Sequence, residues 1–283
     1  MAVLKGKVAI VTGASRGIGA AIARRFAAEG ARVAVVARTR SPGGPLAGSL
    51  DEVVAAIHAG GGEAIAIEAD LSHPEGRSHI VPETVSAFGG VDILVNNAAW
   101  SRFVPIWQAQ RRHMLLALEM NLLAPLELAQ AVQPIMQQRG TGWILNISSA
   151  TADLPPPAPH DPADRAVRFH RETHPSLYGL SKAALDRMSA GWACELGEST
   201  VAVNALAPVG AVASEGALAV GGWDDRDHIE PVEAMAEAAL QLCHRPASEL
   251  SGRVIRSLPL LAELGVPVRT LDGRAILSAE SSE

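Results

Sequence analysis

The segment covering residues 7–37 restricts the fold of this chain more than any other. A β-branched apolar run over 7–12 leads directly into a turn with glycines at 13, 17 and 19. Apolar residues at helical spacing follow over 20–29, and a second apolar run covers 32–37. This order predicts strand, helix and parallel strand within about thirty residues. Because the glycines permit close approach of a pyrophosphate to a helix N-terminus, we expect a dinucleotide-binding unit.

The end of the second apolar run bears on the choice of cofactor. An acidic residue there is typical of NAD binding, whereas an arginine accommodates the 2′-phosphate of NADP. This run ends in Ala37 and Arg38 without a carboxylate, and Arg16 lies inside the glycine turn. Two cations and no acid favour NADP over NAD. The alternative is that Arg38 and Arg40 are solvated surface charges.

The only tyrosine of the chain, Tyr178, is followed four positions later by Lys182. In a helix, positions i and i+4 share a face, so the phenol and the ammonium would point into the same space. A nearby cation stabilises the phenolate and lowers the phenol pKa from its usual value of about 10. The pair therefore predicts a proton donor for a ketone or an acceptor for an alcohol, although this spacing also arises by chance.

The remaining chain continues the alternation of strands and helices. We expect helices over 50–59, 74–88, 112–138, 176–196 and 231–243, and strands over 63–68, 91–96, 143–147, 201–207 and 253–257. Seven strands in alternation predict an α/β fold with a Rossmann-type, doubly wound parallel sheet and helices on both faces. One domain would cover residues 1–257, with a C-terminal extension over 258–283. Ligands would bind where the strands end, near residues 13, 38, 70, 96, 148 and 208.

Composition excludes several classes of function. The net charge of −6 and the lack of a basic patch argue against a nucleic-acid partner. We expect no membrane span and no signal peptide, and hence a cytoplasmic protein. Cys194 and Cys243 fall in expected helices, where we predict small, buried and reduced residues.

Five motifs in order resemble the short-chain dehydrogenase/reductase family. They are TGASRGIG at 12–19, Asn96-Asn97-Ala98-Ala99, Asn121, Ser149 and YGLSK at 178–182. The resemblance covers roughly residues 4–257 and identifies the chain as a member of that family. A Gly/Pro-rich insertion over 39–49 is similar to one in the hydroxysteroid dehydrogenase-like branch, and its position suggests that it covers the cofactor.

The resemblance implies a set of cofactor contacts. The glycine turn would hold the pyrophosphate through Gly13, Ser15, Arg16, Gly17, Ile18 and Gly19. The adenine would lie at Asp70, which Leu71 follows, and Lys182 would hold the nicotinamide ribose. The other expected contacts are Arg38, Asn97, Ala98, Ala99, Tyr178 and Pro208. Two departures from the family pattern are Ala99, where the family has glycine, and the late hydroxyl of Ser214 after Pro208.

The resemblance also implies the catalytic residues Asn121, Ser149, Tyr178 and Lys182. Tyr178 would exchange the proton, Ser149 would bind the carbonyl oxygen, and Asn121 would anchor a water-mediated proton relay. Ser148 and Ser149 face opposite ways if they continue a strand, and the resemblance selects Ser149. We expect reversible hydride transfer between NADPH and the carbonyl or secondary alcohol of a mostly apolar small molecule. The alternatives are an NAD-dependent secondary-alcohol dehydrogenase and a non-catalytic NADPH-binding regulatory protein.

A second insertion, over 150–176, separates Ser149 from Tyr178 by far more residues than the family usually has. It would form a loop over the substrate pocket, or alternatively a solvated excursion. Its histidines 160, 170 and 174 are unevenly spaced and predict no metal site. The expected pocket walls are Trp100, Phe103, Val104, Trp107, Val209 and the long 150–176 loop, with a substrate loop over 209–230. By the resemblance, helices 112–138 and 176–196 would form the faces of a homodimer or homotetramer.

Overall fold

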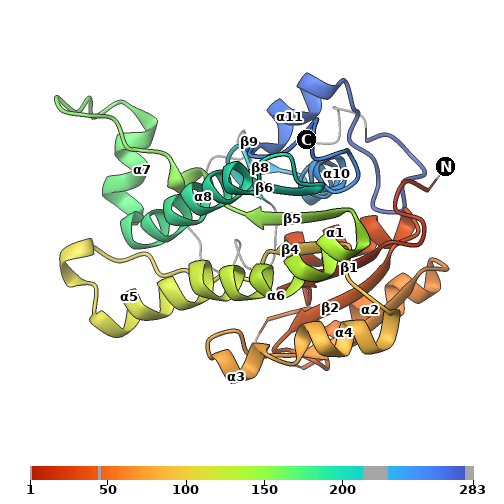
Figure 1. Ribbon diagram of the computed structural model, residues 1–283. Helices are drawn as coiled ribbons and strands as arrows, with labels where there is room; N and C mark the ends of the chain where they lie inside the picture. Colours follow the sequence, from red (N-terminus) through yellow and green to blue (C-terminus); the bar gives the residue numbers. More distant parts are fainter. Residues whose placement is uncertain (1, 44–45, 213–228, 278–283) are drawn as a thin grey trace.

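A seven-stranded parallel sheet forms the centre of the computed structural model, which describes residues 2–43, 46–212 and 229–277 (Figure 1). The strand order is β3-β2-β1-β4-β5-β6-β9, the doubly wound order that the sequence predicts. The strands are β1 (Val8–Thr12), β2 (Arg32–Ala37), β3 (Glu63–Glu68), β4 (Ile93–Asn96), β5 (Gly142–Ile147), β6 (Val201–Ala207) and β9 (Val254–Arg256). A separate short parallel pair joins β7 (Ala211–Val212) to β8 (Ile229–Glu230).

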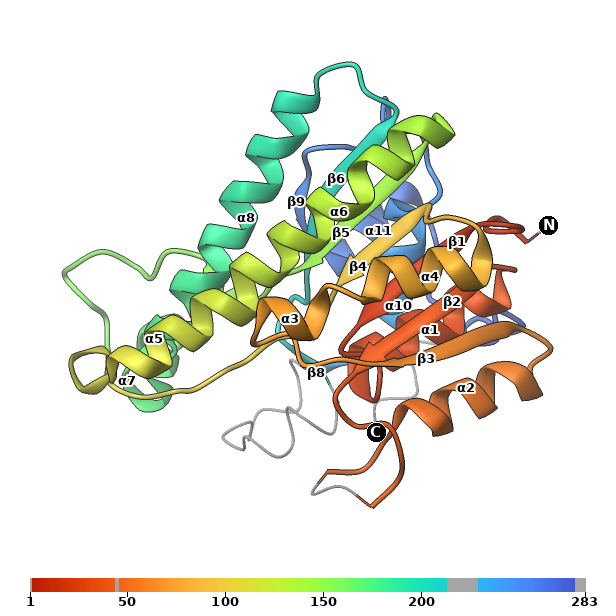
Figure 2. The ribbon, with the colours of Figure 1, turned by 60° about the horizontal axis from the view of Figure 1, so that its bottom comes forward.

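Helices cover both faces of the sheet (Figure 2). One face carries α1 (Gly17–Ala28), α2 (Leu50–Ala59), α10 (Val232–Leu242) and α11 (Ser257–Leu264). The other carries α4 (Ile80–Phe88), α6 (Ala124–Arg139) and α8 (Ser176–Leu196). The described part of the chain also contains α3 (Pro74–Arg77), α5 (Arg111–Leu118) and α7 (Arg165–Thr173). Side chains of β1 alternate between the two cores, Ala9 and Val11 in one and Ile10 in the other.

The helix expected over 74–88 is wrong, because the structure divides it into α3 and α4. Pro82 is the third residue of α4, and it has no N–H to donate to the carbonyl of Ser78. Its ring would also clash with that carbonyl in a continuous helix. The chain therefore starts a new helix after Ser78.

The helix expected over 112–138 is interrupted by a π-helical turn at Glu119–Leu123. The proline at 125 cannot donate to the carbonyl of Asn121, four residues before it, so the regular α-helical ladder cannot pass this point. Single π turns often occur at functional sites. This one contains Asn121, which is fully buried.

The stretch Arg111–Arg139 is also the one place in the described chain where a helix is long and apolar enough to cross a membrane, against the expectation of no such run. Its most apolar 18-residue window has a mean hydropathy of 1.3. Core helices of water-soluble proteins pass the same test, so this is weak evidence for a span. Leu128, Val132 and Met136 pack in the core between this helix and the sheet.

The 150–176 insertion contains a helix where the sequence predicts a loop. Asp164 caps α7 by accepting a hydrogen bond from Val167 N at 3.0 Å. The first part of the C-terminal extension is also ordered, since Leu260 and Leu261 of α11 are buried in the core. Cys243 is buried as expected, whereas Cys194 is exposed, because its position on α8 faces away from the sheet.

Candidate functional site

Three adjoining cavities follow the carboxyl edge of the sheet. The first, of about 200 Å³, is lined by Gly13, Ser15, Arg38 and Leu71 among others. The second, of about 320 Å³, contains Tyr178, Lys182 and Pro208 and shares Arg16, Asn97 and Ala99 with the first. The third, of about 470 Å³, shares Ser149, Thr151, Gly210 and Ala211 with the second. One elongated ligand and a second small one could therefore meet at Ser149.

The glycine turn leaves no room for side chains on its inner surface. Gly13 has a φ of +65°, and a Cβ there would lie 2.8 Å from the Cα of Ala98. A Cβ on Gly19 would lie 2.5 Å from both the carbonyl oxygen of Gly13 and Nδ2 of Asn97. Helix α1 starts directly after the turn, without a side-chain cap and without an acidic residue in its first turn. This backbone cradle at a positive helix end fits the pyrophosphate of a dinucleotide.

Asn97 and Thr12 fix the cradle against β4. The amide of Asn97 donates to the carbonyls of Thr12 (2.9 Å) and Gly13 (3.2 Å). The hydroxyl oxygen of Thr12 in turn accepts from the backbone N–H groups of Asn97 and Ala98. Ala99, which stands where the family has glycine, lines both the first and the second cavity.

The two cations that favour NADP have different surroundings. Arg16 donates from Nε to the carbonyl of Ala47 (2.7 Å) and from Nη2 to the carbonyls of Leu46 and Gly48, so the first insertion holds its side chain. Arg38 is exposed and lines the first cavity. Its neighbour Arg40 pairs with Asp51 at 3.1 Å.

The carboxylate expected at the adenine, Asp70, lies at the end of β3. Burial opposes its ionisation, but hydrogen bonds from the backbone and hydroxyl of Ser72 and the charge of Arg38 hold its pKa below the usual value. Asp70 therefore stays ionised at neutral pH. Ala69 and Leu71 on either side of it line the first cavity.

Tyr178 and Lys182 lie on one face of α8 and both line the second cavity. Lys182 is almost fully buried and its Nζ donates to the carbonyl of Ile147 at 2.7 Å. Burial lowers the pKa of Lys182 to about 8, and the charge of Asp186 opposes this change. Lys182 Nζ lies 5.8 Å from the centre of the tyrosine ring.

The expectation that Lys182 lowers the pKa of Tyr178 is wrong for this structure. Burial of the phenol raises its pKa to about 12, and only a hydrogen bond with Ser149 opposes the rise. Desolvation penalises the phenolate more than the lysine stabilises it, because the ammonium is turned toward the carbonyl of Ile147. The phenol is therefore protonated at neutral pH.

Of the two serines, Ser149 lines the second and third cavities, whereas Ser148 is buried and lines only the second. The hydroxyl oxygen of Ser149 accepts from the backbone N–H and the hydroxyl of Thr151. Ser149 and Tyr178 thus meet where the cavities join.

Asn121 does not line any of these cavities: its amide donates to the carbonyl of Trp100 (2.8 Å) and to the hydroxyl of Ser181 (2.9 Å). Its place in a proton relay stays a prediction.

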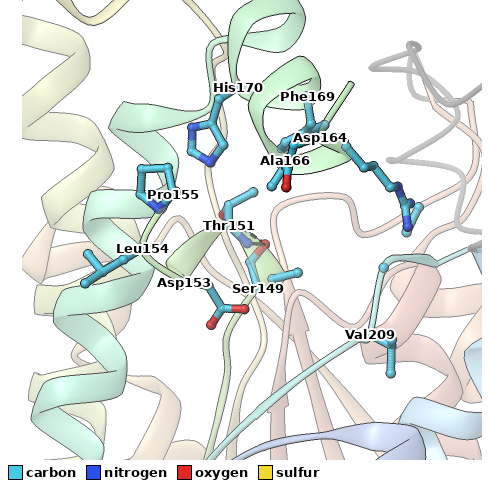
Figure 3. A pocket seen from close by; sticks show the side chains of 14 residues that line it. Ser149, Thr151, Asp153, Leu154, Pro155, Asp164, Ala166, Phe169, His170 and Val209 are labelled. Atoms are coloured by element: carbon cyan, nitrogen blue, oxygen red, sulfur yellow. Dashed lines mark hydrogen bonds between the residues drawn. The ribbon is translucent and has the colours of Figure 1, made fainter. Parts of the chain in front are cut away.

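The third cavity lies under the 150–176 insertion (Figure 3). Ala166 and Phe169 of α7 lie above Ser149 and Thr151, and Val209 lies on the opposite side. Burial lowers the pKa of His170, so its ring is neutral at neutral pH. In the described ranges, the histidines do not gather with other ligands into a metal site.

The expected walls of this cavity are partly confirmed, since the 150–176 insertion supplies most of its lining residues. Of the five expected residues only Val209 lines it, whereas Phe103 lines the second cavity beside Tyr178. Trp107 is 77% exposed, and its ring contacts the ring of His174. The sequence predicts that the insertion forms this wall, but not that the wall includes a helix, α7. The apolar pair Val167 and Phe169 within a charged stretch was the available signal for it. Ser214 and most of the expected loop over 209–230 lie outside the described residues.

Comparison with known proteins agrees with this arrangement. The model of the short chain dehydrogenase family matches residues 7–159. An uncharacterized oxidoreductase of Methylorubrum extorquens is 36% identical over 78% of this chain and 79% of its own length. Hydroxysteroid dehydrogenase-like protein 2 of Danio rerio is 31% identical over 93% of this chain, which spans 60% of that protein. A short chain dehydrogenase from Burkholderia cenocepacia in complex with NADP has a TM-score of 0.74 at 32% identity, covering 89% of this chain and 96% of that one.

The resemblance inferred from the motifs is therefore confirmed, including that to the hydroxysteroid dehydrogenase-like proteins. The cradle lies within the matched residues 7–159. Nicotinamide dinucleotide binding follows from the same similarity. The chain belongs to the short-chain dehydrogenase/reductase family, oxidoreductases that act on CH–OH groups.

Proposed function

We propose that this protein reduces, reversibly and with NADPH, the carbonyl group of a mostly apolar small molecule to a secondary alcohol. The observation that carries the proposal is the position of Ser149, which is shared by the second and third cavities and lines the second together with Tyr178. A carbonyl oxygen placed there would lie next to both hydroxyls. The Gly/Ala wall at 210–211 and the apolar side chains of α7 favour an apolar remainder of the substrate.

The bound nicotinamide would supply the hydride, and the chain would position and polarise the carbonyl. Tyr178 donates the proton to the oxygen, and the pKa of about 12 keeps the donor protonated across the neutral range. Ser149 donates a hydrogen bond to the developing alkoxide. Lys182 and Pro208 line the cavity in which the nicotinamide end would lie. The protonated phenol is the form that donates in the reduction, and the reverse reaction would need the phenolate as base.

The preference for NADPH rests on Arg38. It lies at the end of β2 with no carboxylate beside it on that strand, and it lines the first cavity. The Arg16 side chain donates hydrogen bonds to carbonyl groups of the first insertion. Arg16 therefore contributes to the cofactor site by fixing the glycine turn, and Arg38 is the cation that would bind the 2′-phosphate. The NADP in the related crystal structure supports the same choice.

The first experiment is a fluorescence titration with NADPH and with NADH, followed by a screen of apolar ketones with the preferred cofactor. Tyr178→Phe should still bind the cofactor but lower kcat at least about 100-fold, the low end for loss of a general acid. Retained turnover in Tyr178→Phe would reject the mechanism. Failure of the wild-type protein to bind either cofactor would reject the function altogether.

We further propose a cytoplasmic homodimer or homotetramer without a nucleic-acid or membrane partner. A groove of about 780 Å³ between α6 and α8 supports the assembly. Its floor and rim include Leu126, Met188 and Trp192. Sedimentation that shows only monomer at micromolar concentration would reject this assembly.

A further inference from the structure

Glu230 is a buried carboxylate that the proposed chemistry does not use. It is 5% exposed and is the last residue of β8, shortly before α10. Its Oε2 accepts a hydrogen bond from the backbone N–H of Val209 at 3.0 Å. Both of its oxygens are within hydrogen-bond distance of the Ser257 hydroxyl, at 2.7 and 2.9 Å. Because Ser257 is the first residue of α11, one carboxylate joins three separate segments.

The bond to Val209 reaches a wall of the substrate cavity. Val209 lines the third cavity, and the next two residues, Gly210 and Ala211, line both the second and the third. The β7–β8 pairing places Val212 opposite Glu230. The carboxylate therefore joins residues 209–212 to β8, and residues 209–211 form part of the cavity wall.

Arg256 extends the connection to the opposite wall. Its guanidinium pairs with Asp153 at 2.5 Å, and Asp153 lines the third cavity four residues after Ser149. Burial raises the pKa of Glu230, while its hydrogen bonds from Ser257 and Val209 and the charge of Arg256 oppose the rise. Glu230, Ser257, Arg256 and Asp153, the wall network, thus link both sides of the cavity through the junction of β9 and α11.

A second buried carboxylate, Glu237, is a useful comparison because its contacts serve only the stability of the fold. Glu237 of α10 is 2% exposed, pairs with Arg25 of α1 at 2.9 Å and lines none of the three cavities. Both carboxylates carry a desolvation cost that an apolar side chain would avoid. Only Glu230 directs its hydrogen bond to the backbone of a cavity wall.

We propose that Glu230 is a positioning residue for the substrate: it holds Val209, and through the wall network Asp153, at the spacing that the substrate requires. This inference rests on the proposed function for its kinetic consequence but not for its structural one. An amide in place of the carboxylate carries no charge, and it replaces one of the two acceptor oxygens with an NH2 group that cannot accept a hydrogen bond from Ser257 or Val209. Glu230→Gln is therefore the informative substitution, and Glu237→Gln is its matched control.

The structural test is hydrogen exchange of the cofactor-free protein, followed in peptides that cover 205–212 and 149–155. Glu230→Gln should speed exchange at the Val209 amide by about tenfold or more, as expected for a local opening, and should also speed exchange near Asp153. Glu237→Gln should lower the melting temperature at least as much without a selective change in these peptides. Unchanged exchange in Glu230→Gln, or the same pattern in both variants, would overturn the inference.

The kinetic test uses NADPH and the ketone that the wild-type protein reduces fastest in the screen. Glu230→Gln should raise the KM for the ketone about tenfold with kcat within about threefold, because the carbonyl still reaches Tyr178 while the wall no longer fits. Ser257→Ala should act in the same direction with a smaller effect, and it replaces Glu230→Gln if that variant does not fold. A KM equal to that of Glu237→Gln would overturn the inference. A wild-type protein that reduces no ketone counts against the proposed function, while the exchange experiment still decides the role of Glu230.

Discussion

The cofactor end and the substrate end of this site are built from different parts of the chain. The first cavity and the glycine turn consist largely of backbone, fixed by close contacts among β1, β4 and the start of α1. The third cavity consists of side chains that α7 and the residues after β6 bring together from distant segments. The cofactor end therefore has little tolerance for added atoms. The substrate end can change its walls without changing the sheet.

The largest effect on ligand binding should follow from adding one carbon atom to the cofactor end. Gly19→Ala should raise the dissociation constant for NADPH by about 100-fold or more, about 2.8 kcal/mol. The new Cβ would lie 2.5 Å from the Gly13 carbonyl oxygen and from Asn97 Nδ2, and both are held in place. Fluorescence titration measures the effect. Gly60→Ala is the control, since a Cβ there meets its nearest atom at 3.4 Å, and it should bind NADPH normally. Normal binding by Gly19→Ala would show that the turn can relax.

A change of charge at the rim of the first cavity should have an intermediate effect. Arg38→Asp should reverse the preference from NADPH to NADH, with a change of about 10- to 100-fold in the affinity ratio, because a charge-assisted hydrogen bond contributes about 1.5–3 kcal/mol. Arg40→Gln, whose side chain pairs with Asp51, should leave the ratio unchanged. An unchanged ratio in Arg38→Asp would mean that the 2′-phosphate is recognised elsewhere.

The smallest effect should follow from opening the substrate end. Phe169→Ala should raise the KM for an apolar ketone about tenfold, the range for loss of a few methylene-sized contacts in an apolar pocket. The dissociation constant for NADPH should stay the same, because Phe169 lines only the third cavity. Arg168→Gln, on the exposed side of α7, is the control. Equal changes in KM and NADPH affinity would show that the two ends are not independent.

The same division explains what the sequence could predict. The bounds of β2, β3, β6, α2 and α8 match the expected ranges, since each has a local apolar period and a local stop signal. The glycine turn is equally local. The breaks at Pro82 and Pro125 were missed because the apolar period continues through both prolines.

The pKa of Tyr178 and the walls of the third cavity depend instead on contacts made across the fold. Spacing on α8 places Lys182 near the phenol, but it cannot show that Ile147 takes the ammonium as a hydrogen-bond partner. Similarly, Glu230 is far from Ser149 in sequence and reaches the wall at Val209 only through tertiary packing. The insertion that carries Phe169 is predicted to lie over the pocket, but its local pattern does not show which of its side chains line the cavity. The family motifs identify the reacting groups, and the fold decides their environment.

The contact between Arg16 and the first insertion makes the glycine turn and that insertion depend on each other. The guanidinium satisfies the carbonyls of residues 46–48, and Gly48, with a φ of +94°, lies so close to Ser15 that a Cβ would come within 2.5 Å of its carbonyl oxygen. Loss of Arg16 would leave the carbonyl groups of residues 46–48 without this hydrogen-bond donor. A side chain at position 48 would clash with the backbone of the glycine turn. Arg16 and Gly48 therefore depend on each other structurally, because a change at either position would alter the contact that joins the glycine turn to the first insertion.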